Sequence, residues 1–284
     1  MQISRRKFCV LGGAAVSALA RPPAVQGPRE PRSYYGGFRV GISARCFGNL
    51  PINQLTAKVT ALGLKYLELS PAQADLSTIS TPDLRRLRAQ ILDAGLSVHD
   101  YGVLQVRGKP RRRDLETIFA RAEEFGFESL ITDSEEGALK ELDRLAGRFR
   151  VNVAVINHAG GFATADALRK VLDDYSERIG AAVDTGRFLV AGADPATAIR
   201  RLKDRIFAVR LTDVSPSGSF CPLGKGRFDL PSCLRALRES DYDGLLTLPC
   251  EGFPNSEEAI AESLEYLKKI SGVIPLTNPE SIVS

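Results

Sequence analysis

The sequence predicts an α/β protein whose single domain folds as a closed (β/α)8 TIM barrel. Three observations support this class. The chain has 284 residues, 44% of them hydrophobic and 25% charged, which is enough for one large core. From residue 38 onward, short apolar runs alternate with amphipathic stretches, a pattern typical of parallel strands covered by helices. Eight such units fit into about 230 residues, close to the usual size of an eight-unit barrel.

The predicted strands are the short apolar runs. The clearest is RVNVAVIN, in which Val151, Val153 and Val155 alternate. An open doubly wound sheet is the alternative, but it predicts a phosphate-binding G-x-G-x-x-G after the first strand, and GISARCFGNL contains none. We expect strands at 38–43, 64–69, 96–103, 127–132, 150–157, 178–184, 205–213 and 244–251.

The predicted helices carry start and stop signals. Thr81 is expected to cap a helix that has Pro82 at its first position and Gly95 after its end. Asp194 and Pro195 start another helix in the same way. We expect helices at 52–63, 82–94, 112–125, 135–149, 164–174, 195–204, 230–240 and 256–270.

The amino terminus predicts export. Residues 1–20 have a charged start, a run of 13 mildly apolar residues and a small-x-small ending, and the Arg5-Arg6 pair resembles a twin-arginine signal. The alternative is a chance basic start before a buried helix. Thirteen residues are too few to span a membrane as a helix. We expect a signal at 1–20, a proline-rich linker at 21–37, the barrel at 38–272 and an irregular tail at 273–284, with the mature protein periplasmic or otherwise extracytoplasmic.

Charge gives no reason to expect nucleic acid as a partner. The formal net charge is +4, but three basic residues and no acids lie in the first 20 residues, so removal of that segment leaves +1. A local exception is RGKPRRR (107–113), with five basic residues in seven. This segment either attracts an anionic substrate or is a solvated loop.

Polar residues accumulate where the predicted strands end, and barrels of this class carry their chemistry at the carboxyl ends of the strands. These residues have two structural interpretations instead of a functional one. The acids at the strand ends, above all Asp133, would cap the following helices, or the charges at the rim would only neutralise one another. The candidate residues are Glu68, His99, Asn157, His158, Asp184, Arg187, Arg210 and Glu251, with Lys225 from the loop after the seventh strand.

Four cysteines remain beyond the predicted signal, and none forms a C-x-x-C motif. Cys46 and Cys250 end the first and last strands, which are neighbours in a closed barrel, so a disulfide between them is geometrically feasible in an exported protein. Free half-buried thiols and a metal site of cysteines with His158 are the alternatives.

Four segments carry a resemblance to a known family: LKYLELSPAQ, NVAVINHAGG, RIGAAVDTGRFLVAGADPATAIRRLKDRIFAVRLTDV and LGKGRFDLPSCLRALRESDYDGLLTLPCEG. From about residue 38 to 270 the chain resembles the xylose isomerase-like TIM-barrel superfamily of sugar phosphate isomerases and epimerases. That resemblance implies one divalent metal with four ligands, placed at the ends of strands 5, 6, 7 and 8. The corresponding positions here are Ile156, Asp184, Arg210 and Pro249, so one ligand of four is kept. The sequence therefore predicts no metal cofactor.

Two functions follow from the resemblance. One is a sugar isomerase or epimerase in which Glu68, His158 and Glu251 are catalytic. His99, Asn157, Asp184, Arg187, Arg210 and Lys225 would then bind the substrate. The other is a non-catalytic barrel that binds a sugar-like ligand or a protein partner. The expected ligand in either case is a sugar or an anionic sugar derivative.

Overall fold

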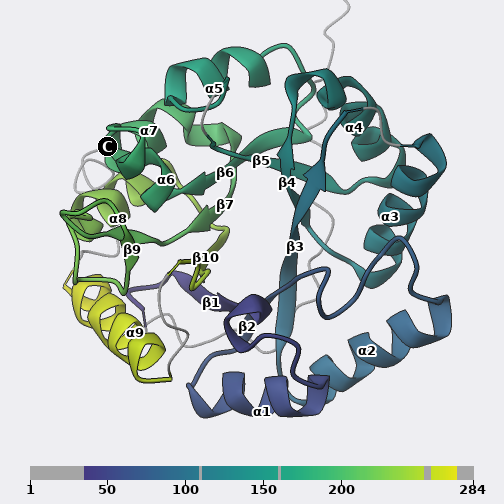
Figure 1. Cartoon of the computed structure of the whole chain (residues 1–284), viewed down its shortest axis with the longest axis horizontal. Coiled ribbons are helices and arrows are strands. Elements are labelled where there is room, and N and C mark those ends of the chain that lie inside the picture. Colours follow the sequence, from purple (N-terminus) through teal and green to yellow (C-terminus); the bar gives the residue numbers. More distant parts are fainter. Residues whose placement is uncertain (1–34, 109–110, 159–160, 253–256, 274–284) are drawn as a thin grey trace, which may run out of the picture.

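The computed structural model describes residues 35–108, 111–158, 161–252 and 257–273. Its eight parallel strands close into one barrel in the order β1-β10-β7-β6-β5-β4-β3-β2, as predicted. Helices surround the barrel (Figure 1). The predicted signal and the predicted tail beyond Val273 lie outside the described residues. Within the described ranges, no helix is both long and apolar enough to cross a membrane.

The barrel strands are short and mostly buried, because helices cover the outside and side chains fill the inside. Val40 and Ile42 in β1, for example, are at most 1% exposed. The strands are β1 (Arg39–Ser43), β2 (Tyr66–Leu69), β3 (Ser97–Val106), β4 (Ser129–Ser134), β5 (Asn152–Ile156), β6 (Ile179–Asp184), β7 (Ile206–Arg210) and β10 (Leu245–Leu248).

The helices agree with the predicted ranges to within a few residues. Ser80 rather than Thr81 caps α2, through a hydrogen bond from the Asp83 amide to the Ser80 hydroxyl. Asp194 caps α7, as predicted. The covering helices are α1 (Ile52–Ala61), α2 (Thr81–Asp93), α3 (Arg112–Phe125), α4 (Glu136–Phe149), α5 (Ala165–Leu172), α7 (Pro195–Leu202), α8 (Leu230–Glu239) and α9 (Glu257–Gly272).

Five short elements were not predicted. A single turn, η1 (Ala44–Phe47), follows β1, and η2 (Lys203–Arg205) precedes β7. The helix α6 (Thr185–Val190) follows β6 directly. The antiparallel pair of β8 (Asp213–Val214) and β9 (Phe220–Cys221) forms a hairpin within the loop after β7. All of these except η2 follow strands and so lie at the carboxyl ends, whereas η2 lies at the amino end of β7.

Two boundaries differ from the prediction. The predicted strand at 96–103 continues to Val106, and its pairing with β4 shifts register between Tyr101 and Leu104. The packed region also begins before residue 38, because Tyr35 is 3% exposed and belongs to the hydrophobic core. Part of the segment predicted as linker is therefore packed against the barrel.

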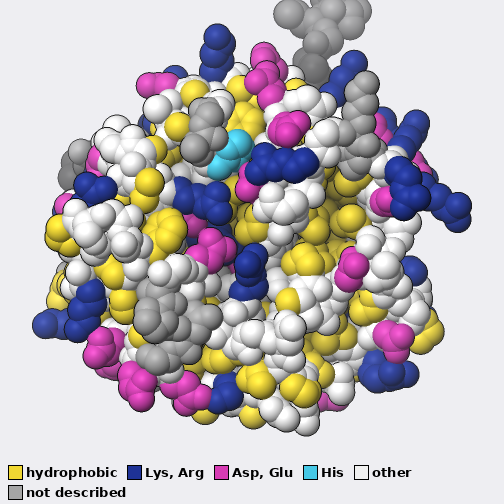
Figure 2. Space-filling view, viewed as in Figure 1, with side chains coloured by type: hydrophobic (Ala, Val, Ile, Leu, Met, Phe, Trp, Pro, Cys, Tyr) yellow, Lys and Arg dark blue, Asp and Glu magenta, His cyan; other side chains and the backbone are white. Residues whose placement is uncertain are grey.

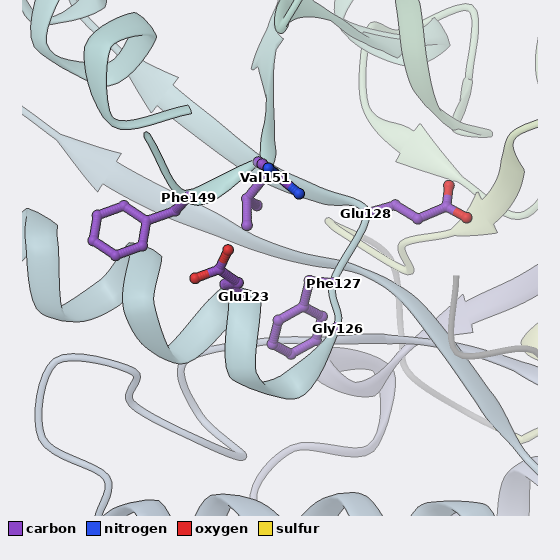
Figure 3. A pocket seen from close by; sticks show the side chains of 7 residues that line it. Glu123, Gly126, Phe127, Glu128, Phe149 and Val151 are labelled. Atoms are coloured by element: carbon purple, nitrogen blue, oxygen red, sulfur yellow. The ribbon is translucent and has the colours of Figure 1, made fainter. Parts of the chain in front are cut away.

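A small pocket lies at the amino-terminal end of β4 and β5 (Figure 3). It is lined by residues that precede these strands, among them Phe127 and Val151, and by Glu123 and Phe149 from the neighbouring helices. In Figure 3 the side chain of Glu128 points away from the other labelled side chains. The pocket is at the end of the barrel opposite to the carboxyl ends, where residues serve stability rather than chemistry.

Candidate functional site

The centre of the carboxyl rim is occupied by the guanidinium of Arg210, the last residue of β7. Arg210 is 0% exposed and reaches across the barrel to β2, where Nη1 donates to both carboxylate oxygens of Glu68 at 2.6 Å. Its Nη2 donates to Oε1 of Glu251 at 3.1 Å. Its Nε lies 3.8 Å from Oδ2 of Asp184, its register partner on β6, and has no hydrogen-bond acceptor among the described residues.

Arg187 forms the outer layer of this cluster. It lies in the first turns of α6, with a side chain that is 28% exposed. Its Nη2 lies 3.7 Å from Oε2 of Glu251, and its Nε lies 3.8 Å from Oδ2 of Asp184. Glu251 therefore has one oxygen directed at each arginine. We call Glu68, Asp184, Arg187, Arg210 and Glu251 the rim cluster.

Asp184 both caps α6 and contributes a buried carboxyl group to the rim cluster. Its Oδ1 accepts a hydrogen bond from the Arg187 amide at 3.1 Å and so caps α6. Burial raises the pKa of the Asp184 carboxyl above its ordinary value, and the nearby Glu251 charge adds to that shift, whereas Arg210 and Arg187 oppose it. The rim cluster has three carboxylates for two guanidiniums, which agrees with one carboxyl that holds its proton more tightly.

Arg210 itself stays charged. Burial disfavours its cationic form, but the charges of Glu68, Glu251 and Asp184 outweigh burial and raise the pKa of the guanidinium. A buried cation of this kind is stable only because its hydrogen-bonding partners are in place. The cluster is thus a single assembly, and its members depend on one another.

Asn157 and His158, which follow β5, point to different partners. The Asn157 amide donates to the Asp184 carbonyl oxygen at 3.1 Å and accepts from the Asp184 amide at 2.7 Å, so it holds the backbone at the end of β6. The Nε2 atom of His158 lies 3.3 Å from the Ser134 carbonyl oxygen and 3.6 Å from Oδ1 of Asp133.

Asp133 and Arg107 form an ion pair at the rim, although neither was among the predicted site residues. Arg107 Nη2 donates to Oδ1 of Asp133 at 2.7 Å. The expectation that Asp133 caps the next helix is wrong, because Glu135 occupies the N-cap position of α4. What the sequence did not show is that these two residues pair, because β3 continues to Val106 and so brings Arg107 beside the end of β4.

The structure places two predicted site residues away from the rim cluster. His99 is the third residue of β3, near its amino end, where Nδ1 lies 3.2 Å from Oε1 of Glu128 and the ring contacts Tyr66. The strand continues three residues further than predicted, which moves His99 away from the carboxyl rim. Lys225 is 58% exposed and lies 3.2 Å from Glu262 on α9. Neither side chain contacts the rim cluster.

Of the three alternatives for Cys46 and Cys250, the structure has the disulfide. Cys46 in η1 and Cys250 after β10 are bonded, with their Cα atoms 5.4 Å apart. Cys221 and Cys233 are free thiols. The bond lies next to Glu251 and joins the two strands that close the barrel.

Basic and acidic side chains gather near the centre of the face in Figure 2, with a histidine beside them. Across the described ranges, no group of three or more histidine, cysteine or acidic side chains is arranged to hold a metal ion. In the rim cluster the cation that faces Asp184 is the Arg210 guanidinium, and Ile156 and Pro249 supply no donor atom. These residues do not fit the divalent ion that the family resemblance implies.

Comparisons with known proteins agree with this architecture. The chain is 28% identical over 170 residues to an inosose dehydratase of Lacticaseibacillus casei, a match that covers 51% of this chain and 56% of that protein. The chain spans about half the length of the curated relatives that it matches.

Two solved structures have the same fold. A protein of Parabacteroides distasonis has a TM-score of 0.64 and 25% identity, over 82% of this chain and 98% of the other. A 3-keto-D-glucoside 4-epimerase of E. coli has a TM-score of 0.68 and 16% identity, over 82% of this chain and 99% of the other. The model of the family described as xylose isomerase-like TIM barrel matches residues 56–270. This chain therefore belongs to the xylose isomerase-like TIM barrel family.

Proposed function

We propose that this protein is an exported sugar-modifying barrel that acts on an uncharged polyhydroxy ketone, such as a keto-sugar or an inosose, without a divalent metal. The observation that carries the proposal is the position of the Arg210 guanidinium, which is buried among Glu68, Glu251 and Asp184 at the centre of the rim. In metal-dependent active sites a bound metal ion supplies a fixed positive charge. Here the buried guanidinium of Arg210 supplies a fixed positive charge at the centre of the rim. The names of an inosose dehydratase and a keto-glucoside epimerase among the similar proteins support the substrate class.

Exposure assigns the roles within the site. Arg210 and Glu68 have no exposed side-chain surface, so they hold the assembly together. Glu251 and Arg187 are 24% and 28% exposed, and His158 is 18% exposed. Contact with a ligand therefore falls to these three side chains.

The proposed chemistry is proton transfer at the carbon beside the ketone. Epimerisation of a keto-sugar and elimination of water from it both begin when a base removes this proton. Glu251 is the candidate base, and Arg187 would stabilise the negative charge that develops on the ketone oxygen. His158 would hold or move a second proton on the neighbouring side of the rim.

The balance of charge favours an uncharged ligand. Three carboxylates surround the two guanidiniums of the rim cluster, and Asp133 neutralises Arg107 beside it. A phosphate or carboxylate would meet arginines whose charge is already balanced by acidic partners, so it would gain little electrostatic attraction. Hydroxyl groups, in contrast, both donate to carboxylates and accept from guanidiniums.

Two observations support export. The first 20 residues have the composition of a twin-arginine signal. The Cys46–Cys250 disulfide is of a kind that persists in oxidising compartments and is rare in a reducing cytosol.

A non-catalytic sugar-binding barrel is the second candidate. It is favoured by the pairing of Glu251 with both Arg210 and Arg187, because these ion pairs engage both oxygens of the candidate base. The two candidates share the binding site and differ in whether a proton is exchanged.

The experiment has two stages. Thermal unfolding in EDTA is measured with matched neutral and phosphorylated sugars, for example fructose against fructose 6-phosphate, and with scyllo-inosose. A ligand at 100 times its Kd adds about 2.7 kcal/mol, which raises the Tm by roughly 5–10 °C. We expect a neutral ketone to raise the Tm more than its phosphorylated partner. Glu251→Gln and Arg187→Gln should bind more weakly and so reduce the shift, and Lys225→Gln is the matched control.

Incubation of the bound ketone in deuterated water then separates the two candidates. Deuterium at the carbon beside the carbonyl, seen by NMR with the wild type and lost in Glu251→Gln, supports catalysis. A ketone that binds without exchange supports the binding protein. If no neutral sugar raises the Tm, or if binding requires an added divalent metal, the proposed function is wrong.

A further inference from the structure

The disulfide lies directly beside a residue of the rim cluster. Cys250 precedes Glu251 in sequence, and Cys46 anchors it to η1, which follows β1. Both cysteines are 3% exposed, whereas Glu251 carries the solvent-facing carboxylate of the site. One covalent bond therefore fixes the backbone next to the side chain that meets Arg187 and Arg210.

The strand ladder does not extend to this point. The pairing between β1 and β10 ends with Ile42 and Leu248, and Pro249 has no amide hydrogen with which to continue it. Cys250 itself adopts a left-handed backbone conformation, with φ of 53°. The backbone thus turns away from the sheet before Glu251, and the disulfide holds it at the turn.

The two contacts of Glu251 depend on its placement. Its Oε1 lies 3.1 Å from Arg210 Nη2, while its Oε2 lies 3.7 Å from Arg187 Nη2. A shift of about 1 Å would break the first contact, since a hydrogen bond of this type needs a distance near 3 Å. Small displacements at a site of this kind reduce its activity strongly.

We propose that the Cys46–Cys250 disulfide is a positioning element for Glu251, so that the rim site binds its ligand fully only when the bond is formed. This inference rests on the proposed function, because it assigns a redox requirement to the same site. Reduction by a dithiol breaks the S–S bond. Two electrons and two protons pass to Cys46 and Cys250, and the dithiol is oxidised to its own disulfide.

The test is a double-mutant cycle that combines loss of the disulfide with the substitution Glu251→Gln. Binding of the neutral ketone that stabilises the oxidised protein best is measured by calorimetry, well below the Tm. Four proteins are compared: the wild type, Cys46→Ala/Cys250→Ala, Glu251→Gln and the triple variant. We expect loss of the disulfide to weaken binding about tenfold or more in the wild type, as for one lost hydrogen bond to a charged group. It should change binding less than about twofold in the Glu251→Gln background.

Two controls separate positioning from general loss of stability. Leu139→Ala removes a buried side chain of α4 on the outside of the barrel and should leave the Kd unchanged although it destabilises the fold. Wild-type protein reduced with dithiothreitol should reproduce the double variant, and reoxidation with oxidised glutathione should restore binding. Equal weakening in both backgrounds, or no weakening in either, overturns the proposal.

A readout without ligand keeps the proposal testable if no sugar binds. The side-chain Nε–Hε NMR signal of Arg210 reports its contacts. The signal of Arg205 is the internal control, because this buried arginine donates to carbonyl oxygens at the opposite end of the barrel. We expect loss of the disulfide to shift the Arg210 signal and not that of Arg205. An unchanged Arg210 signal would overturn the positioning role, whatever the outcome of the ligand screen.

Discussion

Replacement of Arg210 by methionine tests whether the rim cluster is one electrostatic assembly. The change removes a fully buried cation and leaves Glu68, which is also 0% exposed, without the donor that lies 2.6 Å from both of its oxygens. Removal of one partner from a buried ion pair costs about 3–5 kcal/mol. Glu251 and Asp184 add little to this loss, because Glu251 reaches water and Asp184 keeps the guanidinium of Arg187 as a neighbour at 3.8 Å.

The assay is urea unfolding at pH 7 followed by circular dichroism, with the free energy of unfolding extrapolated to water. We expect Arg210→Met to lose about 3–5 kcal/mol, and Arg210→Met/Glu68→Met to regain most of that loss, since a buried ion pair is often replaceable by apolar side chains. The exposed pair of Arg200 and Glu239 is the control, and Arg200→Met should cost about 1 kcal/mol or less. A loss below about 1 kcal/mol for Arg210→Met, or a double variant less stable than the single one, would refute the reasoning.

Three further predictions concern stability. The Cys46–Cys250 bond closes a loop with a sequence separation of 204, so its removal should lower the free energy of unfolding by about 5 kcal/mol at most, as measured by urea unfolding of Cys46→Ala/Cys250→Ala. The pKa of Asp184 is raised by burial, so the folded state binds its proton more tightly. Relative to Asp184→Asn, the wild type should therefore gain stability as the pH falls through the folded pKa towards the ordinary value of 3.8, and a flat difference between the two proteins would contradict this. Asn157→Ala should cost about 1–3 kcal/mol, because it leaves buried backbone groups at the end of β6 without partners, and an unchanged urea midpoint would contradict that role.

The barrel was predictable because its signals are local and repeated. Apolar runs alternate with well-capped helices, so the order of strands followed from the chain. Closure then brought Cys46 next to Cys250, and it brought Asp184 together with Arg210 and Glu251. A closed barrel fixes which strand ends are neighbours, and this constraint made much of the rim predictable from sequence.

The errors arose where register and side-chain reach decide the outcome. We expected the third strand to end at residue 103, but β3 shifts its register and continues to Val106, which places His99 near the start of the strand. Strand periodicity does not reveal such a shift. The complete burial of Arg210 also could not be predicted from the sequence, because it depends on Glu68 extending from the other side of the barrel.

The proposed function centres on metal-free recognition of an uncharged ketone through Glu251 and Arg187. The most direct measurement is calorimetric titration of the ketone into wild type and Glu251→Gln, each in EDTA and then with excess Mn²⁺. The account predicts that the wild type binds with the same Kd in both buffers and that Glu251→Gln binds much more weakly in both. Binding that appears only with Mn²⁺, or that is the same in both proteins, would contradict it.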